Sequence, residues 1–428
     1  MTAATEHAAP YLAALPVPSG QSWLDGLREA AARQFASRGF PQTSEEEWRF
    51  TNVAPIARVP FRPARAEDAR QEAGALDATL FPAAGAGRLV FLNGRFAPEF
   101  SSPVPGITAG SLAEAIGREP DAVSAHLGRH ADIAANPFVA LNTAFIEDGA
   151  WLRVAKNAVP EQPVYLVFVG GGSDSPTVCH PRTLVTVGPN AQVTLAEIYI
   201  GAGDGVAFTN AVTEIVVAEN AVVDHYKVLL EPLETFHVAT MQVWQGRSSN
   251  FSSHSFSMGG ALVRNDANST VEEGGECTLN GLYVAGGTQH IDNHTAIDHA
   301  KPHGASHELY KGILDGKASA VFNGKVYVRQ DAQKIDAKQT NKNLVLSEDA
   351  VINTKPELQI WADDVRCTHG ATIGQLDAEA IFYLQSRGIA REDARALLTR
   401  AFARDVIDRV KPEPLRHLLE RALARRLE

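Results

Sequence analysis

The spacing of hydrophobic and polar positions changes twice along the chain, and the first part, residues 1–150, has a mixed pattern. From residue 22 on, apolar residues recur at helical spacing, at Leu24, Leu27, Ala31 and Phe35. Gly39 is expected to end that helix. An apolar run at residues 88–92 is followed by Asn93 and Gly94, which predicts a β-hairpin. We interpret residues 1–150 as an N-terminal, mainly helical α+β region.

A second helix start is predicted at Ser44. This serine is followed by Glu45, Glu46 and Glu47. A serine side chain can accept hydrogen bonds from the free N–H groups of a first helical turn, and negative charge is favourable at that end. We therefore expect a capped helix to begin there.

Residues 151–377 have a different pattern, in which short apolar runs follow one another with Gly, Asn and Asp between them. These runs predict strands, among them residues 164–169, 192–200, 222–230 and 320–328. No amphipathic helix of convincing length separates them, which excludes a sheet built from alternating strands and helices. A polar turn followed by a small residue recurs at uneven spacing, at residues 188–191, 219–221, 273–275, 315–318 and 348–350. The pattern alone leaves a β-solenoid and a sandwich or barrel about equally open.

Residues 378–428 return to helical spacing. Asp377 is expected to cap a helix that ends at Gly388, a longer apolar stripe runs on to Val410, and a last helix follows Pro414. Two interpretations stay open for this region. The helices either cap the end of the strand region or form a docking element for another protein.

Composition and charge narrow the class of protein. The chain has 428 residues, with 50 acidic against 39 basic side chains and a net charge of -11, which argues against a nucleic-acid binder. No apolar run is long enough to span a membrane, and the N-terminus lacks the pattern of a signal peptide, so we expect a cytoplasmic protein. Cys179, Cys277 and Cys367 are too few for a disulfide framework or for a cluster held by four thiolates of this chain.

Histidines are concentrated in one segment, at His290, His294, His299, His303 and His307. If the segment begins as a strand, alternation places His290, Asp292 and His294 on one face, which is a plausible metal-ligand set. The alternative is a structural ladder of hydrogen-bonded histidines on neighbouring coils. The later histidines have helical spacing, but Pro302 lies among them and makes a helix there implausible.

A second candidate site is formed by Cys367 and His369. One residue separates them, so an extended chain directs both side chains to the same face. A thiolate beside an imidazole suits iron, zinc or sulfur transfer. The alternative is that Cys367 is a small buried apolar residue. The chain has no GxxxxGK[ST] motif, so nucleotide hydrolysis through a P-loop is excluded.

Several motifs closely resemble the SufB/SufD family of iron–sulfur assembly proteins. They are residues 308–314 (ELYKGIL), 322–328 (FNGKVYV), 341–347 (NKNLVLS) and 362–372 (ADDVRCTHGAT), together with the histidine-rich run at 290–306. The resemblance covers about residues 280–410 almost without interruption. Residues 46–52 (EEWRFTN), Gly370 directly after the motif histidine, and the low number of cysteines are similar to the SufD side of the family.

The resemblance implies a mainly β fold with a right-handed parallel β-helix core at residues 151–377, between the N-terminal region and a C-terminal helical region. It implies a non-catalytic scaffold that pairs with a SufB-like paralogue and carries the ABC-type ATPase SufC on its C-terminal helices. His369, with Cys367 beside it, would contribute to iron or a nascent cluster where the two β-helices meet. No cofactor is expected to stay bound to the isolated chain, iron or a cluster being held transiently in the complex with SufB. A homodimer of the isolated chain stays open.

Two other classes of function are kept as alternatives. One is a freestanding metalloprotein that uses the histidines at 290–307. The other is a carbohydrate enzyme of the pectin-lyase type, which shares the β-helix but needs export, an acid/base constellation and usually aromatic sugar platforms. The aromatic content of 7% counts against the second alternative.

Overall fold

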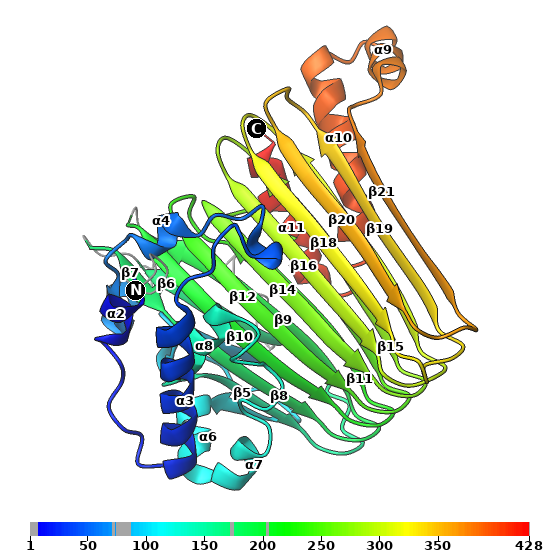
Figure 1. The fold of residues 1–428 in the computed structure, drawn as a ribbon. Coiled ribbons are helices and arrows are strands. Elements are labelled where there is room, and N and C mark those ends of the chain that lie inside the picture. The colour runs from blue at the N-terminus through cyan, green and yellow to red at the C-terminus, as the bar shows by residue number, and fades with distance from the viewer. Residues whose placement is uncertain (1–6, 71–72, 74–86, 172–174, 203–204, 428) are drawn as a thin grey trace.

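The computed structural model describes residues 7–70, 73, 87–171, 175–202 and 205–427. Its centre is a parallel β-solenoid of about seven turns, with helices at its N-terminal and C-terminal flanks (Figure 1). The mainly β solenoid is therefore confirmed, and the sandwich and barrel are excluded.

Each turn of the solenoid contributes one strand to each of two sheets. Sheet A contains, in spatial order, β20 (Val351–Ile360), β18 (Ser319–Val328), β16 (His290–His299), β14 (Leu262–Val271), β12 (Phe236–Gln245), β10 (Ala207–Val217), β8 (Arg182–Val187), β5 (Gly149–Val154) and β4 (Thr108–Ser111), and the short β7 (Thr177–Cys179) and β1 (Arg62–Pro63) join beside β10. Sheet B contains β21 (Arg366–Gly374), β19 (Asp336–Val345), β17 (Ala305–Leu314), β15 (Glu276–Ala285), β13 (Asn250–Ser257), β11 (Val222–Leu230), β9 (Gln192–Ala202), β6 (Val164–Gly171), β2 (Gly87–Leu92) and β3 (Arg95–Phe96). Apolar side chains that point between the two sheets form the largest core.

The turns on one side of the solenoid form a regular column. In each of them one residue has a left-handed backbone, namely Asn157, Asn190, Asn220, Ser248, Gly274, His303 and Lys334. The N–H of each of these residues donates to a carbonyl of the next coil, for example from Asn220 to Arg247 at 3.0 Å. Three turns of this column, at Ser248, His303 and Lys334, carry neither Asn nor Gly at the left-handed position. That is why the repeat is uneven in the sequence although it is regular in space.

The N-terminal region supplies the helices α2 (Ala8–Leu12), α3 (Ser22–Arg38), α4 (Ala54–Ala57), α6 (Leu112–Arg118), α7 (Pro120–Ser124) and α8 (Pro137–Ala144), with short 3₁₀ turns at Ala66–Ala69 and Pro98–Phe100. Helix α3 ends at Gly39, as predicted, where φ is 70°. The hairpin of β2 and β3 is also confirmed, and its Asn93 and Gly94 both have positive φ. Aromatic side chains of these helices pack on Phe208 of sheet A.

The helix predicted to begin at Ser44 is absent, and that prediction is wrong. Only a single 3₁₀ turn forms, at Glu46–Trp48, with no side-chain cap. The neighbouring Glu45 accepts from the backbone N–H of Gln42 and from Arg38 instead. Glu46 and Glu47 pair with the distant Lys355 and Lys325 of sheet A, so the acidic run contacts the solenoid instead of starting a helix.

The C-terminal helices are α9 (Ala378–Ser386), α10 (Arg391–Ile407) and α11 (Glu413–Arg426). Asp377 caps α9 as predicted, accepting from the N–H of Glu379 at 2.9 Å. Helices α10 and α11 pack on the outer face of sheet B, where residues such as Ile407 and Leu419 share a core with Tyr226. The interpretation of this region as a cap on the solenoid end is therefore wrong. Helix α9 has no buried residue and projects from the body of the molecule (Figure 1). No helix within the described ranges is long and apolar enough to cross a membrane.

Candidate functional site at the open end of the solenoid

The C-terminal end of the solenoid is uncovered. Strands β20 and β21 each pair on one side only, and no further strand joins them within the part of the chain that the structure describes. Apolar side chains at this end are open to solvent: Val351 is 52% exposed, Trp361 51% and Ile373 54%. Unpaired strand edges with exposed apolar residues can pair with another chain, so this end is a candidate interface.

Cys367 and His369 lie together on β21, the outermost strand of sheet B. Register pairs them with Ala337 and Gln339 of β19, whose side chains are buried between the sheets. Both therefore occupy the inward-facing positions of the last turn, which confirms the shared face expected from their spacing. Cys367 packs against the apolar cluster of the last turns, and burial raises the pKa of its thiol above the ordinary value. A thiol in that environment is not activated by this chain alone.

His369 is exposed, and its side chain has no hydrogen bond or ion pair with another described residue. The imidazole of His369 is thus available to bind a ligand at the open end of the solenoid. The described residues contain no group of three or more His, Cys, Asp or Glu side chains arranged to hold a metal ion. A metal at His369 would need further ligands from a second molecule.

The first histidines of the predicted cluster lie on the outer face of sheet A. His290, Asp292 and His294 share that face of β16, as alternation predicted, and the segment around Glu47 covers them. The Nε2 atom of His294 lies 3.1 Å from Asp292, and its Nδ1 atom lies 3.5 Å from Glu47. The Nε2 atom of His290 lies 2.8 Å from the hydroxyl of Thr51.

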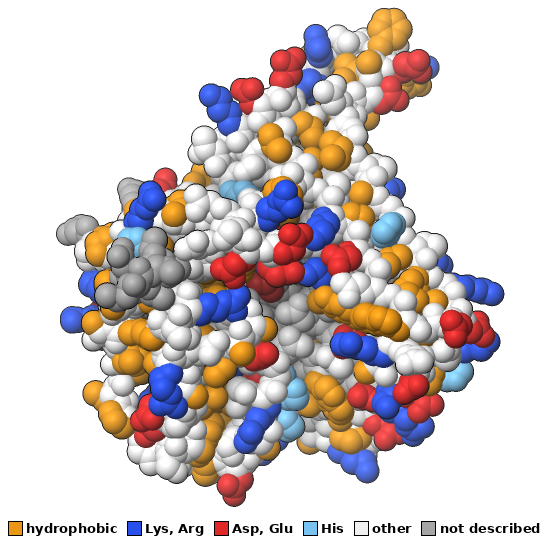
Figure 2. All heavy atoms as spheres, viewed as in Figure 1, with side chains coloured by type: hydrophobic (Ala, Val, Ile, Leu, Met, Phe, Trp, Pro, Cys, Tyr) orange, Lys and Arg blue, Asp and Glu red, His pale blue; other side chains and the backbone are white. Residues whose placement is uncertain are grey.

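Charge pairing completes this contact between the N-terminal segment and the sheet. The guanidinium of Arg264 lies 2.6 Å from Asp292 and stacks over Trp48. Although burial acts to raise the pKa of Asp292, Arg264 and His294 hold it well below its ordinary range. Figure 2 shows acidic and basic side chains gathered where the N-terminal segment crosses the strands. These histidines are thus occupied in holding the N-terminal segment on the solenoid.

The remaining histidines of the cluster are dispersed and not on one helical face. His299 is buried between the sheets, 2.9 Å from the hydroxyl of Ser306. His303 occupies a left-handed turn position, and His307 is exposed on β17. The segment therefore forms strand, turn and strand, and its helical spacing has no structural meaning.

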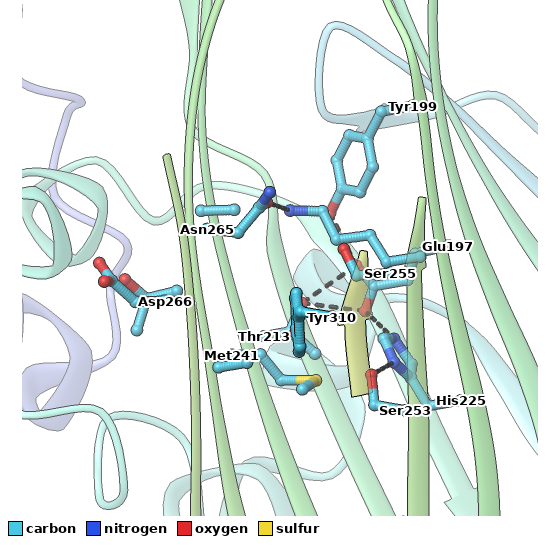
Figure 3. A pocket seen from close by; sticks show the side chains of 14 residues that line it. Glu197, Tyr199, Thr213, His225, Met241, Ser253, Ser255, Asn265, Asp266 and Tyr310 are labelled. Carbon is cyan, nitrogen blue, oxygen red and sulfur yellow. Dashed lines mark hydrogen bonds and ion pairs between the residues drawn. The ribbon is translucent and has the colours of Figure 1, made fainter. Parts of the chain in front are cut away.

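The sequence reasoning missed a polar network inside the solenoid, shown in Figure 3. Glu197, His225 and Ser253 form a chain in which Ser253 lies 2.9 Å from His225 Nδ1, and Glu197 lies 3.4 Å from His225 Nε2. Nearby, Lys227 lies 2.6 Å from Asn265, and burial lowers the pKa of this lysine to about 8. The cavity that these side chains line has a volume of about 30 Å³. Such a space holds about one water molecule, so the Ser–His–Glu arrangement cannot receive a substrate of ordinary size.

A larger groove lies between sheet B and the C-terminal helices. It has a volume of about 880 Å³ and is lined by strand-end residues such as Val284 and Ile313 and by helix residues such as Arg395 and Arg426. Beyond it, Phe382 and Tyr383 of α9 are 72% and 57% exposed. Hydrophobic side chains are visible on this projecting helix in Figure 2. The C-terminal helices thus carry exposed apolar side chains on α9 and line a groove beside sheet B.

Comparisons with known proteins agree with this organisation. Residues 168–402 match a family model described as the SufBD core domain of the SUF system for FeS cluster assembly, and residues 18–166 match the SufBD N-terminal region. The chain is 38% identical over 401 residues to an iron–sulfur cluster assembly SufBD family protein of Synechocystis, covering 91% of this chain and 88% of that protein. It is 31% identical over 398 residues to the iron–sulfur cluster assembly protein SufD of Escherichia coli, covering 92% of this chain and 91% of that protein.

A further relative is SufD of Bacillus subtilis, which is 29% identical over 298 residues and covers 68% of this chain and 66% of that protein. The family models together span most of the chain, including both the solenoid and the N-terminal region. The chain therefore belongs to the SufBD family of iron–sulfur cluster assembly proteins.

Proposed function

We propose that this chain is a non-catalytic scaffold subunit, which pairs through its open solenoid end with a SufB-like paralogue and helps to build nascent iron–sulfur clusters there. The observation that carries the proposal is the position of His369. Its imidazole is exposed on an edge strand that pairs on one side only and occupies an inward-facing position of the last turn. It lacks the further ligands that iron or a cluster needs. A partner that continues both sheets would bring its own ligands next to it.

In this proposal iron and sulfide are cargo of the complex, and no cofactor stays bound to the isolated chain. His369 would supply one neutral nitrogen ligand. Cys367 would be a second contributor only after its thiol lost a proton, which its partly buried position in the isolated chain disfavours. Most thiolate ligands would therefore come from the paralogue.

We assign the C-terminal helices to a SufC-type ABC ATPase. The absence of a P-loop motif in the sequence supports a division in which a partner hydrolyses ATP. The exposed aromatic side chains of α9 support docking there, because neighbouring exposed apolar residues are typical of surfaces that bind another protein. All three cysteines are unpaired, which supports a reducing compartment such as the cytoplasm.

The experiment is cluster reconstitution with the purified paralogue and ATPase, comparing His369→Ala with His307→Ala. His307 is an exposed histidine of β17, which β19 separates from β21 in sheet B, and it serves as a matched control. His369→Ala is expected to lower the yield of cluster by at least about tenfold, as loss of a ligand or its support typically does, whereas His307→Ala leaves it unchanged. A wild-type yield from the His369→Ala complex would refute the proposed role.

Copurification tests the assigned surfaces separately. Changing both Phe382 and Tyr383 to Ser is expected to remove the ATPase from the complex while the paralogue stays bound. Loss of both partners, or of neither, would contradict the assignment of α9 to the ATPase.

A further inference from the structure

Directly beneath His369, the inner face of sheet B carries a column of polar side chains. Strand register stacks Glu308 of β17, Gln339 of β19 and His369 of β21 at one inward-facing position in successive turns. Glu308 and Gln339 are only 4% and 2% exposed. Neighbouring strands in a sheet are about 4.8 Å apart, so the side chain of Gln339 lies within reach of the imidazole above it.

The amide of Gln339 is held in one orientation by the residue below it. Its Nε2 atom donates to Oε2 of Glu308 at 2.6 Å. While Glu308 is ionised, the reverse orientation would place the amide oxygen against a carboxylate oxygen, which is repulsive. Burial raises the pKa of Glu308 to about 7, so the carboxylate that enforces the observed orientation is the main form above about pH 7.

On the facing sheet A, strand β18 approaches this amide closely. A Cβ atom on Gly324 of β18 would lie 2.2 Å from Nε2 of Gln339. The glycine therefore lets the amide pack against the backbone of β18, and a larger residue there would have to displace it.

This fixed orientation leaves the Oε1 atom of Gln339 without a partner. The atom is buried and accepts no hydrogen bond from any described residue. An amide oxygen can only accept, and a buried acceptor without a donor costs about 1–3 kcal/mol. The next inward-facing polar group above it is the imidazole of His369.

We propose that Gln339, oriented by Glu308, is a positioning residue that accepts a hydrogen bond from one ring nitrogen of His369 and so fixes the imidazole tautomer. The opposite ring nitrogen then keeps its lone pair and is directed away from the stack, toward a ligand at the open end. This rests on the proposed role of His369 in binding iron or a cluster. Metal-binding histidines commonly have their other ring N–H held in this way.

The test is the tautomer of His369 in the full-length chain, read from the ¹⁵N shifts of its ring nitrogens after histidine-selective labelling. The signals are assigned by their loss in His369→Gln. In the wild type one tautomer is expected to dominate in the neutral imidazole. In Gln339→Leu, which keeps the size but removes the acceptor, the two ring-nitrogen shifts are expected to move toward each other as the tautomers mix.

Two further variants separate positioning from general damage to the fold. Lys338→Gln, on the exposed face of the same strand, is the control and is expected to leave the shifts unchanged. Glu308→Gln is nearly isosteric but can turn a donor toward Gln339, so it is expected to mix the tautomers partially while the far-UV circular dichroism and the melting temperature stay near those of the wild type.

Unchanged His369 shifts in both Gln339→Leu and Glu308→Gln would overturn the positioning role. The shifts are measured without cluster assembly, so the two proposals can fail separately. If Gln339→Leu mixes the tautomers while His369→Ala assembles clusters normally, the positioning stands and the role of His369 in assembly falls.

Discussion

The two ends of the solenoid are built from the same kind of turn but finish in opposite ways. At the N-terminal end, sheet A finishes with β4 and sheet B with β3, and both strands run antiparallel to their neighbours. Helices α3 and α8 pack together beside that end and cover sheet A. At the C-terminal end, β20 and β21 finish the sheets with most of their side chains exposed or half-buried.

In the complex that we propose, the covered end stabilises the chain and the open end binds the paralogue. A parallel strand edge that stays open is a liability unless a partner uses it. This chain closes one end with its own elements and places its C-terminal helices on the face of sheet B, leaving the other end free. His369 and Cys367, to which we assign a role in cluster assembly, lie at the free end.

The largest expected effect is at the covered end, from the buried pair of Arg182 and Glu214. Both side chains are 0% exposed, and Arg182 also donates to Asn142 and Thr143. Arg182→Met would leave a buried carboxylate without its cation, which costs about 3–5 kcal/mol. Urea unfolding of the isolated chain measures the loss.

Two further variants test whether the stability lost in Arg182→Met comes from the unpaired buried carboxylate. The double variant Arg182→Met with Glu214→Gln is expected to recover part of the loss, because the amide is uncharged and its oxygen can still accept from the backbone N–H groups of His130 and Ala131. Arg329→Met, which breaks the solvent-exposed pair with Asp298 near the open end, is expected to cost less than about 1 kcal/mol. Equal losses from Arg182→Met and Arg329→Met would contradict the contrast between the ends.

The next effect concerns association at the open end. Ile373 faces the stack on β21 and is 54% exposed, so Ile373→Lys should leave the melting temperature of the isolated chain nearly unchanged. In a paired complex the new charge would be buried without a partner, which should weaken binding of the paralogue at least about tenfold, equal to about 1.4 kcal/mol. Binding measured by isothermal calorimetry or analytical ultracentrifugation checks this, and the same measurement on the chain alone reports any homodimer.

Thr372→Lys is the matched control for that experiment. Thr372 lies one position earlier on the same strand, so alternation directs its side chain to the outer face. A smaller loss of affinity is expected. If both lysines weaken binding equally, or if neither does, the partner does not bind at the inward-facing positions of the last turn.

Features that depend on neighbours in the sequence could be predicted without the structure. The hairpin at Asn93 and Gly94, the cap at Asp377 and the shared face of Cys367 and His369 each follow from a local rule on backbone conformation or side-chain alternation. The family motifs added the solenoid, which periodicity alone left undecided.

Features that depend on register could not be predicted. Helices cover the outer faces of both sheets, so inward and outward positions are both largely buried and alternation does not reveal the inside. That is why the network of Glu197 and His225 was missed, and why Gln339 beneath His369 was not identified. Glu47 was misassigned for a related reason, since its partner Lys325 is 278 positions away in the sequence.

The smallest effect is a pH dependence at the contact between the N-terminal segment and sheet A. Hydrogen bonds with His294 and Lys325 outweigh burial and lower the pKa of Glu47 to about 2 from 4.5. Glu47 therefore contributes stability above about pH 4.5 that is lost as the pH falls toward 2. The pKa of His294 is raised, because Asp292 and Glu47 outweigh burial and Arg264, so its contribution is present at about pH 6 and is lost as the pH rises. The contact should be strongest between about pH 4.5 and 6.5.

Glu47→Gln is expected to remove the part of the pH dependence of stability that lies below about pH 4.5. The side chain of Glu47 is 48% exposed, so solvent screening reduces the expected loss near pH 5.5 to roughly 1 kcal/mol. The loss should shrink below about pH 4.5, because the carboxylate of the unfolded wild type is then protonated while the folded one stays ionised until about pH 2. Urea unfolding of both proteins across this range is the measurement. The control is Glu348→Gln, an exposed position at the open end that should leave the stability curve unchanged. A constant difference between Glu47→Gln and wild type at every pH would mean that packing of the segment, and not its charge, joins it to the sheet.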